Sequence, residues 1–288
     1  MTQPIGFAGV QMAVRQDGDN LDAMTSWLEA IKRNHPSVEM VLFSELCPYG
    51  NRPDLAGAIP GKATEALCQM AKDFGLWLLP GSLYESADGG GYYNTAPVID
   101  PDGKIVARYR KMFPWRPREK SLAGDTPCVF EIPGRLRVGV CICYDQWFPE
   151  VARQLVWMGA DVILNPTMTP TPDRNLELVL ARANAIANQV YFFSVNGVGD
   201  GGNGASVLID PEGEPMAQAD EAETVLFAEI DPELVTRVRE NGTLGLCQVL
   251  KSYRDGGFRF PCHVEGPEAG EGFRRLGPII GAKPADGV

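Results

Sequence analysis

The chain has 288 residues, of which 44% are hydrophobic and 22% are charged. This composition is typical of a globular protein, and it excludes a disordered or collagen-like chain and a small disulfide-stapled scaffold. Acidic residues outnumber Lys and Arg by 37 to 26, so the net charge is −11 and the basic excess of a nucleic-acid-binding protein is missing. No run of 18 uncharged apolar residues occurs, which predicts a protein without a transmembrane helix.

The cysteines and the N-terminus indicate where the protein works. Seven cysteines occur at scattered positions without a CxxC pair, a pattern typical of reduced thiols rather than of a disulfide framework. The first residues lack the basic start and apolar core of a secretory signal. We therefore expect a cytoplasmic protein. Only two histidines occur, which argues against a zinc cluster or a histidine-centred catalytic site.

The first part of the chain alternates strands and helices. Residues 5–13 form an apolar run, and the apolar side chains of a helix follow at helical spacing from Asn20. A second apolar run at residues 38–43 ends abruptly at Ser44 and Glu45. A strand, helix, strand unit of this length predicts parallel pairing of its strands. A second helix at residues 63–74 and a third strand at residues 76–83 follow.

The middle of the chain predicts two hairpins, in which residues 92–99 pair with 104–110 and residues 129–132 pair with 136–143. The α/β alternation then resumes, with helices at 149–158 and 176–188 and strands at 162–164, 190–195, 205–210 and 223–230. No linker divides this part, so residues 1–240 read as one α/β domain. Residues 241–288 contain ten Gly and four Pro. We expect an irregular C-terminal extension that lies at a subunit interface.

Three polar residues stand where apolar strands end, and side chains at such ends face the crevice that holds most α/β active sites. Glu45 in this position has the raised pKa that a general base needs, although an exposed loop acid is the alternative. Lys111 closes a hairpin strand, where a basic residue is usually a solvated edge. Cys143 precedes the helix that begins near Pro149, and backbone N–H groups at that turn favour a thiolate and hold an oxyanion. The alternative for Cys143 is a buried apolar cysteine.

Together these residues and their surroundings resemble the nitrilase, or carbon–nitrogen hydrolase, superfamily. Ser44, Glu45 and Leu46 followed by Tyr49 and Gly50 resemble its glutamate motif. Residues 109–111 resemble its lysine motif, and residues 143–150 resemble its cysteine motif. The resemblance runs from about residue 5 to residue 235, and three motifs in this order are hard to obtain by chance.

The resemblance implies a fold and a mechanism. The fold is a four-layer αββα sandwich, usually dimerised through a helical face. In the mechanism Glu45 takes the proton of Cys143, whose thiolate attacks an amide carbonyl, and Lys111 with a backbone N–H near Tyr144 stabilises the oxyanion. A thioester forms and Glu45 then activates water, without a metal or an organic cofactor. Glu119 matches a second glutamate of the family and orients the substrate amide or Lys111.

The substrate is left open by these motifs. Candidates for the pocket wall are the aromatic and polar residues near the three motifs: Tyr49, Trp115, Tyr144, Trp147, Thr167 and Met168. Arg116 and Arg174 could bind a substrate carboxylate. A small amide, an N-carbamoyl compound and a nitrile all suit the same triad, and a catalytically silent binding module is the alternative outside enzymes. We rank the amidase first, with a homo-oligomer as the expected assembly.

Overall fold

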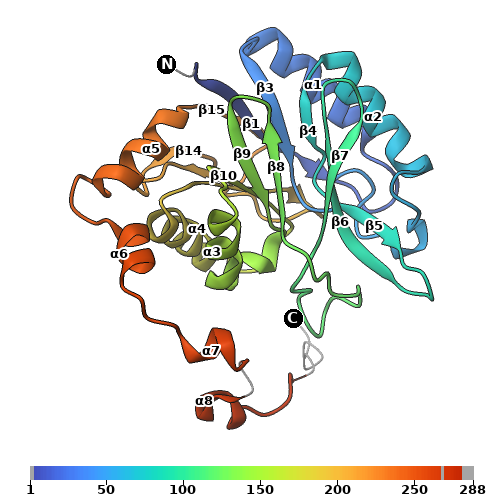
Figure 1. Cartoon of the computed structure of the whole chain (residues 1–288). Coiled ribbons are helices and arrows are strands. Elements are labelled where there is room, and N and C mark those ends of the chain that lie inside the picture. Colours follow the sequence, from blue (N-terminus) through green and yellow to red (C-terminus); the bar gives the residue numbers. More distant parts are fainter. Residues whose placement is uncertain (1–2, 267–268, 281–288) are drawn as a thin grey trace.

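The computed structural model of the chain describes residues 3–266 and 269–280. Two β-sheets lie face to face at its centre, and helices cover their outer faces (Figure 1). The prediction of a single-domain α/β fold with four layers in the order αββα is confirmed. Among the described helices, none is long and apolar enough to cross a membrane.

The first sheet has seven strands, in the order β15-β1-β3-β4-β6-β5 with β7 paired to β6. Its strands are β1 (Ile5–Gln11), β3 (Val38–Phe43), β4 (Trp77–Leu79), β5 (Leu83–Ser86), β6 (Tyr92–Ile99), β7 (Ile105–Arg110) and β15 (Thr224–Ile230). β1 and β3 are parallel, and β6 and β7 form an antiparallel hairpin. The sequence predicts both pairings correctly.

The second sheet has six strands, in the order β14-β13-β11-β10-β9-β8. Its strands are β8 (Cys128–Ile132), β9 (Leu136–Val140), β10 (Val162–Thr167), β11 (Tyr191–Asn196), β13 (Val207–Ile209) and β14 (Pro215–Gln218). β9, β10 and β11 are parallel, and β8 joins β9 as the predicted hairpin. Two short strands, β2 (Ala13–Val14) and β12 (Val198–Gly199), pair outside these sheets.

The helices form the outer layers. Those of the main body are α1 (Leu21–Asn34), α2 (Lys62–Phe74), α3 (Pro149–Trp157), α4 (Arg174–Asn188) and α5 (Pro232–Asn241), with 3₁₀ turns η1 (Pro53–Leu55) and η2 (Cys143–Trp147). α1 and α2 cover the first sheet, and α3 and α4 cover the second. Along β10, Val162 and Leu164 face the core between the sheets, whereas Ile163 faces the helices. The alternation of strand side chains therefore builds three apolar layers.

The prediction of one strand over residues 76–83 is wrong, because the chain turns between β4 and β5. Gly81 lies at this turn with φ +87°, and a Cβ built on it would stand 1.8 Å from the carbonyl oxygen of Ser44. The Ser82 hydroxyl accepts a hydrogen bond from the Leu46 backbone N–H. The turn thus packs directly against the segment that carries Glu45.

The predicted strand over residues 136–143 ends early, at Val140. Cys143 begins η2 with φ +47°, in the left-handed region that residues other than glycine rarely adopt. The Asp145 carboxylate accepts a hydrogen bond from the Ile142 N–H at 2.8 Å and so fixes this turn. The turn takes Cys143 out of the sheet plane.

The C-terminal segment is less irregular than predicted, because it contains the short helices α6 (Val249–Asp255), α7 (Pro261–Val264) and α8 (Glu271–Arg274). In Figure 1 these helices run away from the sheets, below α3 and α4. The segment exposes several apolar side chains, which include Leu244, Leu246, Phe258, Val264 and Ile279. Its place at a subunit interface stays a prediction.

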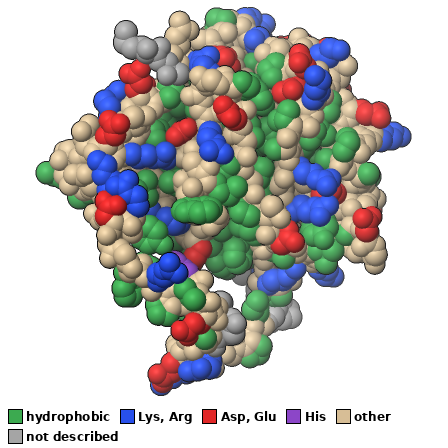
Figure 2. Space-filling view, in the orientation of Figure 1, with side chains coloured by type: hydrophobic (Ala, Val, Ile, Leu, Met, Phe, Trp, Pro, Cys, Tyr) green, Lys and Arg blue, Asp and Glu red, His purple; other side chains and the backbone are tan. Residues whose placement is uncertain are grey.

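The surface carries both signs of charge. On the face shown in Figure 2, basic and acidic side chains are interspersed over both halves of the molecule. Exposed ion pairs also occur on the molecule, such as Arg182 with Glu214 at 2.9 Å. That the protein does not bind nucleic acid stays a prediction.

The Gly81 turn gives a test of the fold next to the site. Gly81→Ala should lower the free energy of unfolding by at least about 3 kcal/mol, because it adds a backbone clash to the strain of a positive φ. Gly89→Ala is the matched control, since Gly89 also has a positive φ, +90°, but open space where a Cβ would stand. Gly89→Ala should lower the free energy of unfolding by only about 1 kcal/mol. Equal losses in urea unfolding would contradict the packing at Ser44.

Candidate active site

The ends of three strands bring the predicted triad together. Glu45 follows β3, Lys111 follows β7, and Cys143 lies three residues after β9. The Glu45 backbone N–H donates to the Thr167 carbonyl at 3.1 Å, which joins the two sheets at this point. Lys111 donates its N–H to the Asn94 carbonyl at 2.9 Å. Backbone hydrogen bonds therefore fix the base and the lysine before their side chains interact.

Lys111 is fully buried, and its ammonium group lies between two carboxylates. Its Nζ is 2.8 Å from Glu45 Oε1 and 2.5 Å from Glu119 Oε1. Burial alone would disfavour the charged ammonium, but Glu45, Cys143 and Glu119 raise the pKa of Lys111 well above its usual value. The interpretation of Lys111 as a solvated strand edge is thereby excluded. A buried charge is tolerated when it has such partners.

The protonation states differ from those expected at the turn. Burial, and then the nearby Glu45 carboxylate, raise the pKa of Cys143 well above that of a free thiol. Burial also raises the pKa of Glu45 to about 6, although Lys111 opposes this. These directions favour a neutral thiol beside the Glu45 carboxyl group in the resting site. The expectation that the turn favours a thiolate is wrong for the free enzyme, since desolvation outweighs the N–H groups.

The thiol has two side-chain neighbours. It lies beside Glu45, and its Sγ lies 3.7 Å from Thr169 Oγ1. Thr169 donates its own hydroxyl hydrogen to Glu177 Oε2 at 2.9 Å, which holds its oxygen in contact with the thiol. The nucleophile thus lies between the base on one side and a threonine on the other.

Asn94 is a site residue that the sequence analysis missed. Its Nδ2 donates to Glu45 Oε1 at 2.8 Å, the same oxygen that accepts from Lys111. Two donors on Oε1 leave Oε2 as the oxygen that takes a proton. Asn94 is buried in β6, where a polar side chain inside an apolar run was the available signal.

Asp145 is a second residue without a predicted role. Its Oδ2 accepts from the Tyr109 hydroxyl at 2.7 Å, and its Oδ1 accepts from the Phe113 N–H at 2.9 Å. Tyr109 and Phe113 flank Lys111, whereas Asp145 lies two residues after Cys143. Burial raises the pKa of Asp145 to about 6. This carboxyl group links the lysine segment to the nucleophile turn.

A small cavity of about 30 Å³ leads to Cys143. Four predicted pocket residues line it together with Glu119: Trp115, Tyr144, Trp147 and Met168. The remaining wall comes from the segment after β10 and the start of α4: Thr169, Pro170, Thr171, Asp173 and Glu177. Thr169 is a polar residue that follows a strand, so the sequence could have indicated it as a site residue. Glu177 lies in a helix with polar residues on several faces, so the sequence could not have indicated it.

Two predicted pocket residues lie elsewhere. Tyr49 packs against the core under α1 and α2, and its hydroxyl donates to the Ala63 carbonyl at 2.6 Å. Thr167 is fully buried in β10, and its hydroxyl donates to the Val195 carbonyl at 3.2 Å. Their assignment to the substrate pocket is corrected, because both hydroxyl groups are used inside the protein.

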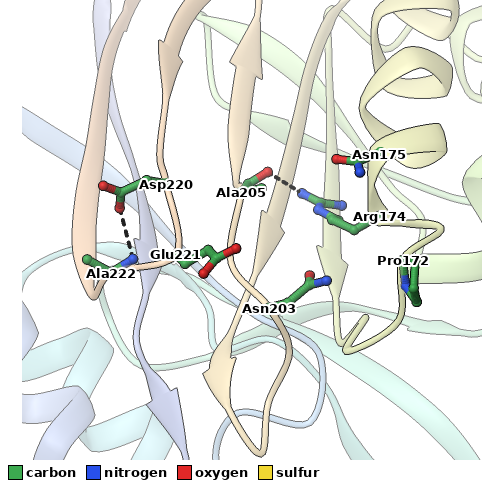
Figure 3. A pocket seen from close by; sticks show the side chains of 8 residues that line it. All are labelled: Pro172, Arg174, Asn175, Asn203, Ala205, Asp220, Glu221 and Ala222. Atoms are coloured by element: carbon green, nitrogen blue, oxygen red, sulfur yellow. Dashed lines mark hydrogen bonds between the residues drawn. The ribbon is translucent and has the colours of Figure 1, made fainter.

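The two arginines considered for a substrate carboxylate also bind groups of the protein. Arg116 donates to the carbonyls of Glu119 and Ser121, and so closes the loop that carries Glu119. Arg174 is buried, and it donates to Glu177 Oε2 at 3.0 Å and to the Ala205 carbonyl at 3.0 Å. Figure 3 shows Arg174 reaching towards Ala205 in the wall of a separate cavity. Neither guanidinium is placed to bind a substrate carboxylate at Cys143.

Metal ligands do not cluster in the part of the chain that the structure describes: no group of three or more His, Cys, Asp or Glu side chains could hold an ion there. All seven cysteines are free thiols. A reaction without a metal or an organic cofactor stays a prediction.

Comparison with known proteins decides the family. The model of the carbon–nitrogen hydrolase family matches residues 7–240. The chain belongs to this family. An omega-amidase of Xenopus tropicalis is 37% identical over 213 residues, which are 67% of this chain and 76% of that protein. A formamidase of Bacillus cereus is 30% identical over 224 residues, 74% of this chain and 68% of that protein.

Comparison with solved structures supports the same family. Saccharomyces cerevisiae Nit3, a member of the nitrilase superfamily, superimposes with a TM-score of 0.75 at 26% identity, covering 83% of this chain and 94% of that one. The predictions of a nitrilase-superfamily member and of an amidase-type hydrolase are confirmed. The three catalytic residues and Glu119 stay assignments from motif and geometry.

The acid limb of the pH profile tests the role of Asn94. Amide hydrolysis should fall as pH drops through about 6, because Glu45 must be ionised to take a proton. Asn94→Ala removes a donor to that carboxylate, so the pKa of Glu45 should rise and the acid limb of kcat/KM should move up by about one pH unit.

Asn188→Ala is the matched control, because Asn188 is another buried asparagine but bonds only to the Asn184 carbonyl among the described residues. It should leave the acid limb in place. An unmoved limb in Asn94→Ala would remove Asn94 from the account.

Proposed function

We propose that this chain hydrolyses a small linear amide through a thioester on Cys143. The observation that carries the proposal is a cluster in which Glu45 lies beside the Cys143 thiol and 2.8 Å from the Lys111 ammonium, next to a cavity that reaches the thiol. A base, a nucleophile and a fixed positive charge at one point are the parts that acyl transfer needs.

In the first half-reaction the substrate carbonyl lies over Cys143. Glu45 takes the thiol proton as sulfur attacks the carbonyl carbon, and the carbonyl oxygen gains the negative charge. Lys111 lies beside it, together with the Tyr144 N–H, which in the first turn of η2 has no partner within that turn. Glu45 then gives its proton to the leaving nitrogen. Ammonia or an amine departs, and the acyl group stays on Cys143 as a thioester.

The second half-reaction uses the same base. Water enters where the amine left, Glu45 removes one of its protons, and the oxygen attacks the thioester carbon. Collapse of the intermediate releases the carboxylic acid, and the proton returns from Glu45 to the sulfur. Glu119 keeps Lys111 in place through both steps by its 2.5 Å contact with Nζ.

Ammonia release tests this function. Wild-type protein should release ammonia from short aliphatic amides, and Cys143→Ala should lower the rate by at least about a thousandfold while it keeps its folded circular dichroism spectrum. N-carbamoyl amino acids, carbamoyl amines and nitriles belong in the same panel. Faster turnover of a nitrile than of every amide would make the chain a nitrilase, and full activity in the folded variant would exclude the cysteine mechanism.

We also infer that the protein is a cytoplasmic homo-oligomer. The seven free thiols support a reducing compartment, and the exposed apolar side chains between Leu244 and Ile280 support a contact with another copy. Light scattering should give at least twice the 31.3 kDa of one chain, and removal of residues 242–288 should reduce the assembly. A monomer of the full chain would contradict this inference.

A further inference from the structure

The wall of the cavity beside Cys143 carries charge that the proposed reaction does not use. Glu177 is 2% exposed and contributes a carboxylate from the first turns of α4. Its Oε2 accepts from Thr169 at 2.9 Å and from Arg174 at 3.0 Å. Its Oε1 accepts only a long hydrogen bond, 3.4 Å, from the Trp147 indole among the described residues. A carboxylate oxygen has room for two donors, so Oε1 has unused capacity.

The charges around the cavity are unequal. Its lining contains the carboxylates of Glu119, Asp173 and Glu177 and no Lys, Arg or His side chain from the described residues. The two cations behind the wall are already paired, since Lys111 contacts Glu45 and Glu119 and Arg174 contacts Glu177. With Glu45 included, four carboxylates surround two cations. The cavity therefore has an excess of negative charge, which attracts a cation and repels a second carboxylate.

Glu177 lies close enough to Cys143 for its charge to act on a substrate bound there. Thr169 bridges the two, 3.7 Å from Cys143 Sγ and 2.9 Å from Glu177 Oε2. A substrate whose carbonyl lies at Cys143 therefore extends its chain along a wall that ends in a carboxylate a few ångströms away. A donor at the far end of a short chain would fill the unused capacity of Oε1.

We propose that Glu177 is a specificity residue that binds a protonated amine at the far end of the substrate, so that the preferred substrates are short amides or carbamoyl compounds that carry a terminal ammonium group. This proposal rests on the proposed function, because it places the reacting carbonyl at Cys143. Trp147 and Tyr144 line the same cavity, and aromatic rings attract an ammonium group.

The first test compares substrates of equal length with wild-type protein: 4-aminobutanamide, pentanamide and succinamic acid. The ammonium amide should have a kcat/KM about tenfold above that of the neutral amide, as one charge-assisted hydrogen bond would give. The amide with a carboxylate should be the poorest of the three. Equal rates for the first two would overturn the proposal, and a preference for the carboxylate would do so as well and direct attention to Arg118, which stacks over Trp115.

Two substitutions show whether the ammonium group binds Glu177 directly or responds only to the net charge of the cavity. Glu177→Gln can still accept from Thr169 and Arg174, but it loses the charge, and the tenfold ratio should fall to about two or less. Asp173→Asn removes another carboxylate of the same cavity and should retain most of the ratio. Equal loss in both variants would mean that net charge, not Glu177, selects the substrate. A ratio within one variant is independent of how much of it folds.

Binding to the inactive protein distinguishes the two proposals. Calorimetry with Cys143→Ala should show tighter binding of 4-aminobutanamide than of pentanamide. If this preference is found but wild-type protein hydrolyses no member of the panel, the amidase proposal fails and the Glu177 site survives. If amides are hydrolysed and bound without a preference for the ammonium group, the Glu177 proposal fails and the amidase proposal survives.

Discussion

The buried ammonium group of Lys111 is the interaction on which the site depends. It has no contact with solvent, and it is held between Glu45 at 2.8 Å and Glu119 at 2.5 Å. A charge buried in this way would be unfavourable without both carboxylates, so Glu45 and Glu119 together stabilise the charged form of Lys111. In the proposed mechanism the ammonium group of Lys111 also stabilises the oxyanion. Structural stability and transition-state stabilisation therefore use one group.

The backbone around this cluster explains how three distant segments meet. Asp145 joins the segment that contains Lys111 to the turn that contains Cys143, through Tyr109 and Phe113. Glu45 is fixed to the second sheet by the hydrogen bond from its N–H to Thr167. The close packing of Gly81 on Ser44 supports the same segment from the other side. The active site is thus a junction of the two sheets rather than a feature of one loop.

Much of this arrangement could be predicted from the sequence. The alternation of strands and helices predicted one α/β domain, and the resemblance to the nitrilase superfamily implied its four layers. Polar residues at strand ends indicated Glu45, Lys111 and Cys143, because an apolar run that stops at a polar residue is a local signal. Features that depend on contacts between distant segments could not be predicted. The break near Gly81 comes from its contact with Ser44, and Asn94 acquires its role only because β6 lies beside the end of β3.

The protonation state of Cys143 could not be predicted from the sequence either. A turn before a helix predicts a stabilised thiolate, but Cys143 is buried next to the Glu45 carboxyl group, and both facts come from tertiary packing. Tyr49, Thr167 and Arg174 were plausible pocket residues by type, yet each satisfies a hydrogen bond inside the protein. Residue type indicates which chemistry is available, and packing decides which residues are free to perform it.

The central claim is that the resting site holds a neutral thiol whose proton passes to Glu45 only when substrate binds. The most direct measurement is the ultraviolet absorbance of the thiolate, recorded against pH as the difference between wild-type protein and Cys143→Ala. The account predicts no thiolate signal from Cys143 at neutral pH and its appearance only in the alkaline range. A full thiolate signal at neutral pH would show a preformed ion pair with Lys111 and would contradict the assignment of Glu45 as the base.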